Sequence, residues 1–161
     1  MLSNENLTRC SSDEFWDEIK REDTNILLGG YPPQTNERFM AQFVSLIESE
    51  LLVNDIVLVD MSLVGFKLKK DPISYFVDRG YSVFHFVLYS SLDVLKSRIQ
   101  RDENRDKEYA LNWANSQEKL LCDFDTSYKI DTTGLSPEDI ARVIVRIVLG
   151  EGDVEDAGDG A

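Results

Sequence analysis

Asp60 stands where an acidic side chain could take part in chemistry, because it directly follows an apolar run. Ile56, Val57, Leu58 and Val59 form an unbroken stretch of β-favouring residues, the pattern of a strand buried on both faces. In an open parallel sheet, ligands lie beyond the carboxyl ends of the strands, which is where Asp60 falls. The alternative is a strand-end aspartate that caps its own loop.

Three arginines further along the chain could hold an anion. Arg98, Arg101 and Arg105 follow one another at spacings of three and four residues, which places them on one face of a helix if the helix continues through residues 102–104. Guanidinium groups pair with phosphate oxygens in a bidentate manner, so such a row could clamp a phosphate. The alternative is a solvated face on which neighbouring acids neutralise the arginines.

A phosphate-binding loop does not occur in the sequence. Such a loop follows a strand, reads Gly-x-x-x-x-Gly-Lys-Ser/Thr and leads into a helix whose N-terminus holds the phosphates. Gly29-Gly30 is followed instead by Tyr31-Pro32-Pro33, and Gly65-Phe66-Lys67 lacks the upstream glycine and the hydroxyl residue.

Composition places the chain among ordinary soluble proteins. It has 161 residues, of which 42% are hydrophobic, and its 17 basic and 30 acidic residues give a net charge of −13. This charge opposes binding to nucleic acid, and no apolar run approaches the roughly 20 residues of a membrane span. The start of the chain does not resemble a signal peptide. Cys10 and Cys122 lack metal-ligand spacing, so we expect free thiols in a reducing cytoplasm.

The elements that would position these residues alternate between helices and strands. Residues 1–34 are interpreted as a lead-in with one short helix, opened by a capping box at Ser11 and Glu14. Residues 1–10 read as loose chain, and Ile26–Leu28 is a candidate small strand. Residues 35–149 form an α/β domain, and residues 150–161 are expected to be a disordered acidic tail.

Within the α/β domain, helical and strand patterns take turns. Helices are predicted at residues 35–52, 71–80, from Ser90 or Ser91 onward, at 109–121 and at 136–149, and strands at 56–59, 81–89 and 128–131. Strands joined by helical crossovers imply a parallel sheet with helices on both faces, a three-layer α/β sandwich.

The order of these motifs resembles the P-loop small-molecule kinases. The nearest match is the tunicamycin-resistance ATP-binding protein family, with shikimate- and gluconate-kinase-like enzymes more distant. The resemblance covers about residues 35–149 and rests on Val57–Leu63, His85–Ser91, Leu95–Ile99, Trp113–Gln117 and Ile130–Ile140.

The resemblance implies roles for particular residues. Asp60 corresponds to the strand-end acid near Mg²⁺ or substrate, and Arg98, with Arg101 or Arg105, to the arginines that stabilise the transferred phosphoryl group. Asp102 stands where a second such arginine normally follows. Asp131, Thr132 and Thr133 would lie beside the adenine of ATP, or form only a turn that leads into the last helix.

The resemblance also implies that the usual first, central strand and its phosphate loop are missing. Without that strand, its neighbours would leave unpaired backbone edges. Three explanations remain open: the chain is an incomplete version of a longer protein, Ile26–Leu28 substitutes for the strand, or the two flanking strands pair directly.

We therefore expect the C-terminal portion, or a degenerate member, of an ATP-dependent small-molecule phosphotransferase family, inactive as this chain alone. ATP and Mg²⁺ would be its cofactors if a complete site exists, with an unidentified phosphate acceptor. The alternatives are a non-catalytic kinase-like protein that binds a protein partner or ligand, and an acidic interaction protein.

Overall fold

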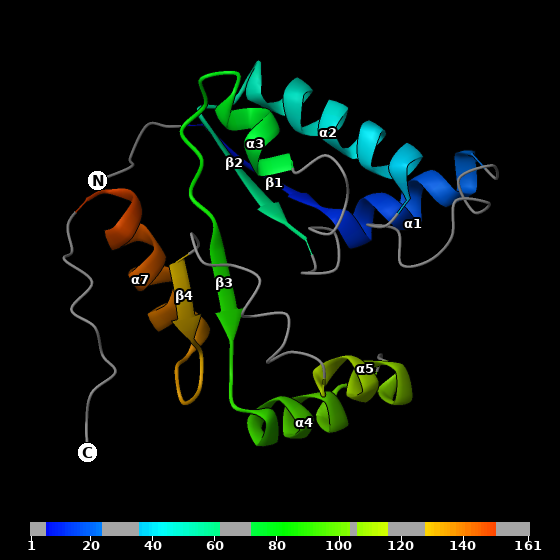
Figure 1. Cartoon of the computed structure of the whole chain (residues 1–161), viewed down its shortest axis with the longest axis vertical. Helices are drawn as coiled ribbons and strands as arrows, with labels where there is room; N and C mark the ends of the chain where they lie inside the picture. Colours follow the sequence, from blue (N-terminus) through cyan, green and yellow to red (C-terminus); the bar gives the residue numbers. More distant parts are fainter. Residues whose placement is uncertain (1–5, 24–35, 62–71, 104–105, 116–127, 151–161) are drawn as a thin grey trace. The chain divides into compact units, whose positions relative to one another are not determined.

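The computed structural model describes residues 6–23, 36–61, 72–103, 106–115 and 128–150, and the chain divides into two compact units (Figure 1). Met1–Ser82 is the N-terminal unit and Val83–Ala161 is the C-terminal unit.

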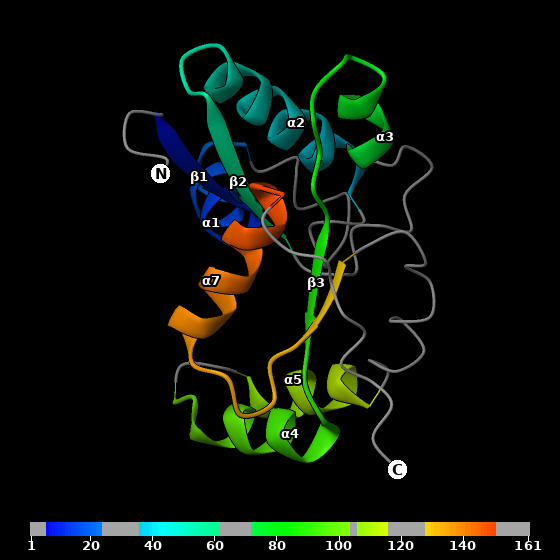
Figure 2. The same cartoon turned by 90° about the vertical axis from the view of Figure 1, so that its left-hand side faces the viewer.

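The N-terminal unit contains a pair of parallel strands with helices. Its elements in chain order are β1 (Leu7–Ser11), α1 (Ser12–Glu22), α2 (Glu37–Leu51), β2 (Ile56–Asp60) and α3 (Pro72–Val77). The two strands lie side by side in Figure 2, with Leu7 opposite Ile56 and Ser11 opposite Asp60. α1 follows β1 without an intervening residue, and four residues separate α2 from β2.

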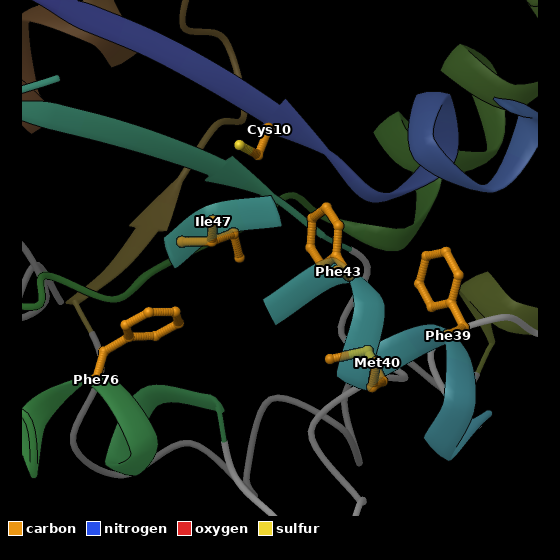
Figure 3. Packing of buried hydrophobic residues seen from close by; sticks show 6 residues of the cluster. All are labelled: Cys10, Phe39, Met40, Phe43, Ile47 and Phe76. Carbon is orange, nitrogen blue, oxygen red and sulfur yellow. The ribbon is translucent and has the colours of Figure 1, made fainter. Parts of the chain in front are cut away.

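The core of the N-terminal unit is built on α2. Asn36 caps this helix, because its side-chain oxygen accepts hydrogen bonds from the backbone N–H groups of Arg38 and Phe39. Phe39, Phe43 and Ile47 then recur every four residues and point to one side. Figure 3 shows them with Met40 of α2, Cys10 of β1 and Phe76 of α3, a buried cluster that links these elements. The rings of Phe39 and Phe43 are fully buried and stacked 5.8 Å apart.

The C-terminal unit has a second pair of parallel strands. Its elements are β3 (Phe86–Tyr89), α4 (Leu92–Arg101), α5 (Lys107–Ala114), β4 (Tyr128–Asp131) and α7 (Pro137–Val148). Phe86 lies opposite Tyr128 and Tyr89 lies opposite Asp131. The buried apolar residues of this unit are Val87, Ile99, Ala114 and Ile130.

Local sequence signals explain where α3 and α7 start and stop. Gly80 closes the turn after α3 with a φ of 85°, a left-handed conformation that favours glycine. At α7, Ser136 and Asp139 form a capping box in which each side chain accepts a backbone hydrogen bond from the other residue. The sequence predicted helices at 71–80 and 136–149, and α3 and α7 lie within these ranges.

The lead-in predicted for residues 1–10 is wrong where the structure describes it, because Leu7–Ser11 is a strand. The capping box predicted at Ser11 and Glu14 is also wrong. Ser11 precedes the helix but makes no side-chain capping hydrogen bond, and the Glu14 carboxylate pairs with Arg9 instead. The candidate strand Ile26–Leu28 lies outside the described residues.

Burial of the strands and of α7 is lower than the sequence predicted. No residue of β2 is buried, and Leu58, Val59 and Asp60 are exposed, since the core cluster meets this strand only through the partly buried Val57. β3 starts at Phe86 rather than Tyr81, and the apolar stripe of α7 is only half-buried.

The mixed α/β composition with parallel strands agrees with the predicted fold class. The predicted boundaries near residues 34 and 150 adjoin segments that the structure does not describe, and they stay predictions. Among the helices in the described ranges, none combines the length and apolar character that a membrane span requires.

Candidate functional site

Asp60 ends β2 in the N-terminal unit and its carboxylate is held by an arginine from the neighbouring strand. The Nη2 atom of Arg9 donates to Oδ2 of Asp60 over 2.8 Å. Arg9 lies opposite Leu58 in the register, two residues before Asp60, and side chains two residues apart share one face of a sheet. The parallel pairing therefore brings the guanidinium to the end of β2.

A second carboxylate meets the same guanidinium. The Nη1 atom of Arg9 donates to Oε1 of Glu14, in the first turn of α1, over 3.0 Å. The hydrogen bond to Asp60 and the charge of Glu14 raise the pKa of Arg9, so its guanidinium stays charged at every physiological pH. We call Arg9, Glu14 and Asp60 the strand-end cluster. It is solvent-accessible, with Arg9 52% and Asp60 64% exposed, so it contributes little to stability.

The junction between β1 and α1 lies next to this cluster and leaves no loop between strand and helix. β1 ends at Ser11 and α1 begins at Ser12. Ser11 is 6% exposed and Ser12 is 1% exposed, whereas the next two residues of the helix, Asp13 and Glu14, are exposed. Phosphate-binding loops place a glycine-rich segment between the strand and the helix. This junction has no such segment.

In the C-terminal unit, Arg98 and Thr132 are brought together at the end of β4. The guanidinium of Arg98 donates to Oγ1 of Thr132 over 3.0 Å and to its carbonyl oxygen over 2.9 Å. The Thr132 hydroxyl in turn donates to the carbonyl of Tyr89 over 2.8 Å, and the backbone N–H of Ser91 donates to the Thr133 hydroxyl over 3.0 Å. These bonds fasten the segment after β4 to the β3–α4 junction.

A shallow pocket of about 230 Å³ opens beside Arg98 and Thr132. The other residues that line it are Leu88, Tyr89, Ser90, Leu95 and Ile140. Its wall is thus largely apolar and includes a guanidinium and hydroxyl groups. Such a wall suits a mostly apolar small molecule with a few polar groups. We call it the C-terminal pocket.

The predicted row of arginines does not form. α4 ends at Arg101, and the following residue, Asp102, has an extended backbone with φ −78° and ψ 107°. Arg98 reaches Thr132, whereas Arg101 is exposed at the helix end and Arg105 lies outside the described residues. The three side chains therefore cannot share one helical face.

The remaining predicted residues keep modest local roles. Asp131 is exposed, and its Oδ1 atom accepts the backbone N–H of Thr133 over 2.8 Å, as an aspartate does in a turn. Across the described parts of the chain, no three His, Cys, Asp or Glu side chains come together as a metal site. The catalytic and metal roles of Asp60 and the catalytic roles of the arginines stay predictions.

Arg9 is the residue that the sequence reasoning missed. It belongs to a short segment, Leu-Thr-Arg-Cys-Ser, whose apolar and polar residues do not alternate cleanly. The available signal was its position directly before a good helix start with two first-turn acids, since a strand followed by a helix is the opening of an α/β fold.

The two parallel strand pairs and their helices form an α/β fold, and a solved structure shares it. The tunicamycin resistance protein of Deinococcus radiodurans matches with a TM-score of 0.58 at 15% sequence identity, over 90% of this chain and 83% of that chain. At this identity the likeness shows the fold alone. No family model matches the sequence. No curated protein matches it either.

Proposed function

We propose that this chain is a degenerate kinase-like protein that binds a nucleoside or a similar flat small molecule without transferring phosphate. The observation that carries the proposal is the direct β1–α1 junction. β1 is paired with the strand that ends in Asp60 and leads into a helix, as the phosphate-loop strand does in these kinases, yet no loop lies between Ser11 and Ser12. The glycine-rich loop that would hold the phosphates of ATP is therefore absent from this junction.

β1 also bears on the central strand that the resemblance left unassigned. Of the explanations for the absent central strand, none named residues 7–11, and these residues supply a strand that pairs with β2. We infer that β1 takes the place of that strand. ATP with Mg²⁺ does not fit the residues described here, because Asp60 is already paired with Arg9 and no phosphate loop precedes the adjoining helix.

The C-terminal pocket supports the binding part of the proposal. Its volume of about 230 Å³ is below the ~300–1,000 Å³ of sites for drug-sized ligands, so it suits a single heterocyclic ring system better than a whole nucleotide. Leu88 and Leu95 would pack against the ring faces. Arg98 keeps N–H groups beyond the two it gives to Thr132, and these could donate to a ring nitrogen or carbonyl.

Isothermal titration calorimetry on the full chain tests the proposal, with adenosine, ATP and Mg-ATP as ligands. We expect the three affinities to agree within about 3-fold, because phosphates and Mg²⁺ add no contact. We also expect no phosphate release from ATP. Binding of Mg-ATP at least about 100-fold tighter than adenosine, or ATP turnover that Asp60→Asn removes, would contradict the proposal.

Two variants test whether the ligand binds in the C-terminal pocket. Arg98→Ala should weaken adenosine binding at least about 10-fold, since the pocket loses a hydrogen-bond donor and the contact that holds Thr132 in its wall. Arg101→Ala, from the exposed end of the same helix, is the matched control and should bind as the unchanged protein does. If none of the ligands binds, the nucleoside part of the proposal fails.

A further inference from the structure

The strand-end cluster raises a question that the proposed function leaves open: what balances the charge of Asp60 if no magnesium ion is held there. Asp60 and Glu14 come from different elements, and both carboxylates reach the same guanidinium, at 2.8 Å and 3.0 Å. A divalent cation is the usual group that draws two carboxylates together at the end of a strand in phosphotransferases. Here an arginine side chain meets both.

The backbone makes this contact a built feature of the strand pair. Arg9 and Asp60 are 51 residues apart in the sequence and meet only because β1 and β2 pair in parallel. Glu14 is brought in by the direct β1–α1 connection, and it gives up the capping role that its position in the helix would favour. Two nitrogens of one planar guanidinium then serve two carboxylates, a geometry that lysine cannot offer.

We propose that Arg9 takes the place of a divalent cation at the end of β2, so that this strand end is neutralised by the protein itself and binds no metal ion. This inference rests on the proposed function, in which the same strand end performs no phosphoryl transfer. It predicts that the protein is insensitive to divalent cations while Arg9 is present. Removing Arg9 would leave two unneutralised carboxylates, to which a cation could bind.

Manganese(II) is the probe, because electron paramagnetic resonance counts free Mn²⁺ directly. We expect no difference in Mn²⁺ binding between the unchanged protein and Asp60→Asn, since Asp60 holds no ion in either. Arg9→Gln should gain a binding site with an affinity at least about 10-fold above that of the unchanged protein. The substitution removes the positive charge that neutralises the two carboxylates and repels a cation. The double variant Arg9→Gln/Asp60→Asn should lose the gain.

Two outcomes would overturn the inference. The first is Mn²⁺ binding to the unchanged protein that Asp60→Asn abolishes, a measurement that does not depend on how well the Arg9 variant folds. The second is a folded Arg9→Gln protein, judged by circular dichroism, that binds Mn²⁺ no better than the unchanged protein. Arg79→Gln, which removes an arginine in the same unit away from the cluster, is the matched control and should gain nothing.

The same data separate this inference from the proposed function. Mn²⁺ at Asp60 in a protein that neither turns over ATP nor prefers Mg-ATP would overturn the role of Arg9 and leave the proposed function standing. ATP turnover by a protein without Mn²⁺ at Asp60 would overturn the proposed function and leave the role of Arg9 standing.

Discussion

Arg98 and Arg101 lie one helical turn apart at the end of α4, and Arg98 is hydrogen-bonded to Thr132, in the segment after β4. Arg98 contacts both the hydroxyl and the carbonyl of Thr132, a residue that is 4% exposed. The two arginines therefore form a natural pair for separating a structural contact from the general effect of losing a positive charge.

We predict that Arg98→Ala lowers the free energy of unfolding by about 1 kcal/mol, because the Thr132 carbonyl and hydroxyl lose a charged donor. Arg101→Ala should change it by less than about 0.5 kcal/mol, as an exposed substitution usually does. Urea denaturation of both variants checks this. Equal effects in the two variants would mean that the contacts with Thr132 contribute nothing measurable.

The capping box of α7 gives a pH-dependent prediction. The side-chain hydrogen bond from Ser136, followed by its backbone N–H, lowers the pKa of Asp139. A carboxylate with a lowered pKa in the folded state adds stability above its unfolded pKa of about 3.9 and loses it as the pH falls through its folded pKa. The loss in the free energy of unfolding caused by Ser136→Ala should therefore be largest at pH 7, and it should become smaller as the pH falls below about 3.9.

Unfolding measurements on Ser136→Ala and the unchanged protein at pH 7 and pH 3 test this. Loss of the serine cap by itself should cost about 0.5–2 kcal/mol at pH 7. Ser136→Thr, which keeps a hydroxyl in the capping position, is the control and should stay close to the unchanged protein. A difference that does not shrink at pH 3 would disconnect the cap from the ionisation of Asp139.

At the scale of elements, α2 supplies most of the buried side chains of the core cluster in the N-terminal unit. Phe43 is fully buried and stacks on Phe39, and both rings lie within 5.6 Å of the Phe15 ring of α1. Phe43 therefore links α1 to α2 through its contact with Phe15, and it links both helices to the core cluster. The turn after α2, in contrast, carries apolar residues that are exposed to solvent.

Phe43→Ala should lower the free energy of unfolding by about 3–5 kcal/mol, because it leaves a cavity in a close-packed cluster. Val53→Ala, at a position 69% exposed in the turn after α2, should change it by less than about 0.5 kcal/mol. Chemical denaturation followed by circular dichroism distinguishes the two. A small loss for Phe43→Ala would mean that the cluster refills the space by repacking.

The elements differ in how far the sequence could predict them. α2 and α7 were predictable because their signals are local: apolar residues at helical spacing, and a cap at the first turn. β1 was not, since its five residues become a strand only by pairing with a segment about fifty residues later. The end of α4 at Arg101 depends on the backbone of Asp102, which composition does not reveal.

The contacts of the candidate site also differ in how far the sequence could predict them. The contact between Arg98 and the segment after β4 joins two residues that the resemblance had already singled out. Arg9 and its two carboxylate partners could not be found, because Arg9 had no place in any motif and its contact with Asp60 spans 51 residues. Long-range pairing between strands was the missing information in both the fold and the site.

For the whole molecule, the net charge of −13 predicts a response to salt. Like charges repel in the compact state, and raising the ionic strength from about 0.01 M to 0.15 M shortens the screening length from ~30 Å to ~8 Å. We expect the thermal unfolding midpoint to rise over this range, as differential scanning calorimetry would record. A falling midpoint would mean that the surface ion pairs outweigh the net repulsion.

Cys10 gives the molecule a kinetic reporter of its own. Its thiol is 4% exposed within the core cluster, and burial raises its pKa, so reagents that attack thiolates must wait until β1 separates from α2. With Cys122 changed to serine, the rate of thiol labelling would measure how often the N-terminal unit opens. Since Arg9 is the neighbouring residue on β1, that rate would also measure how often Arg9 separates from Asp60.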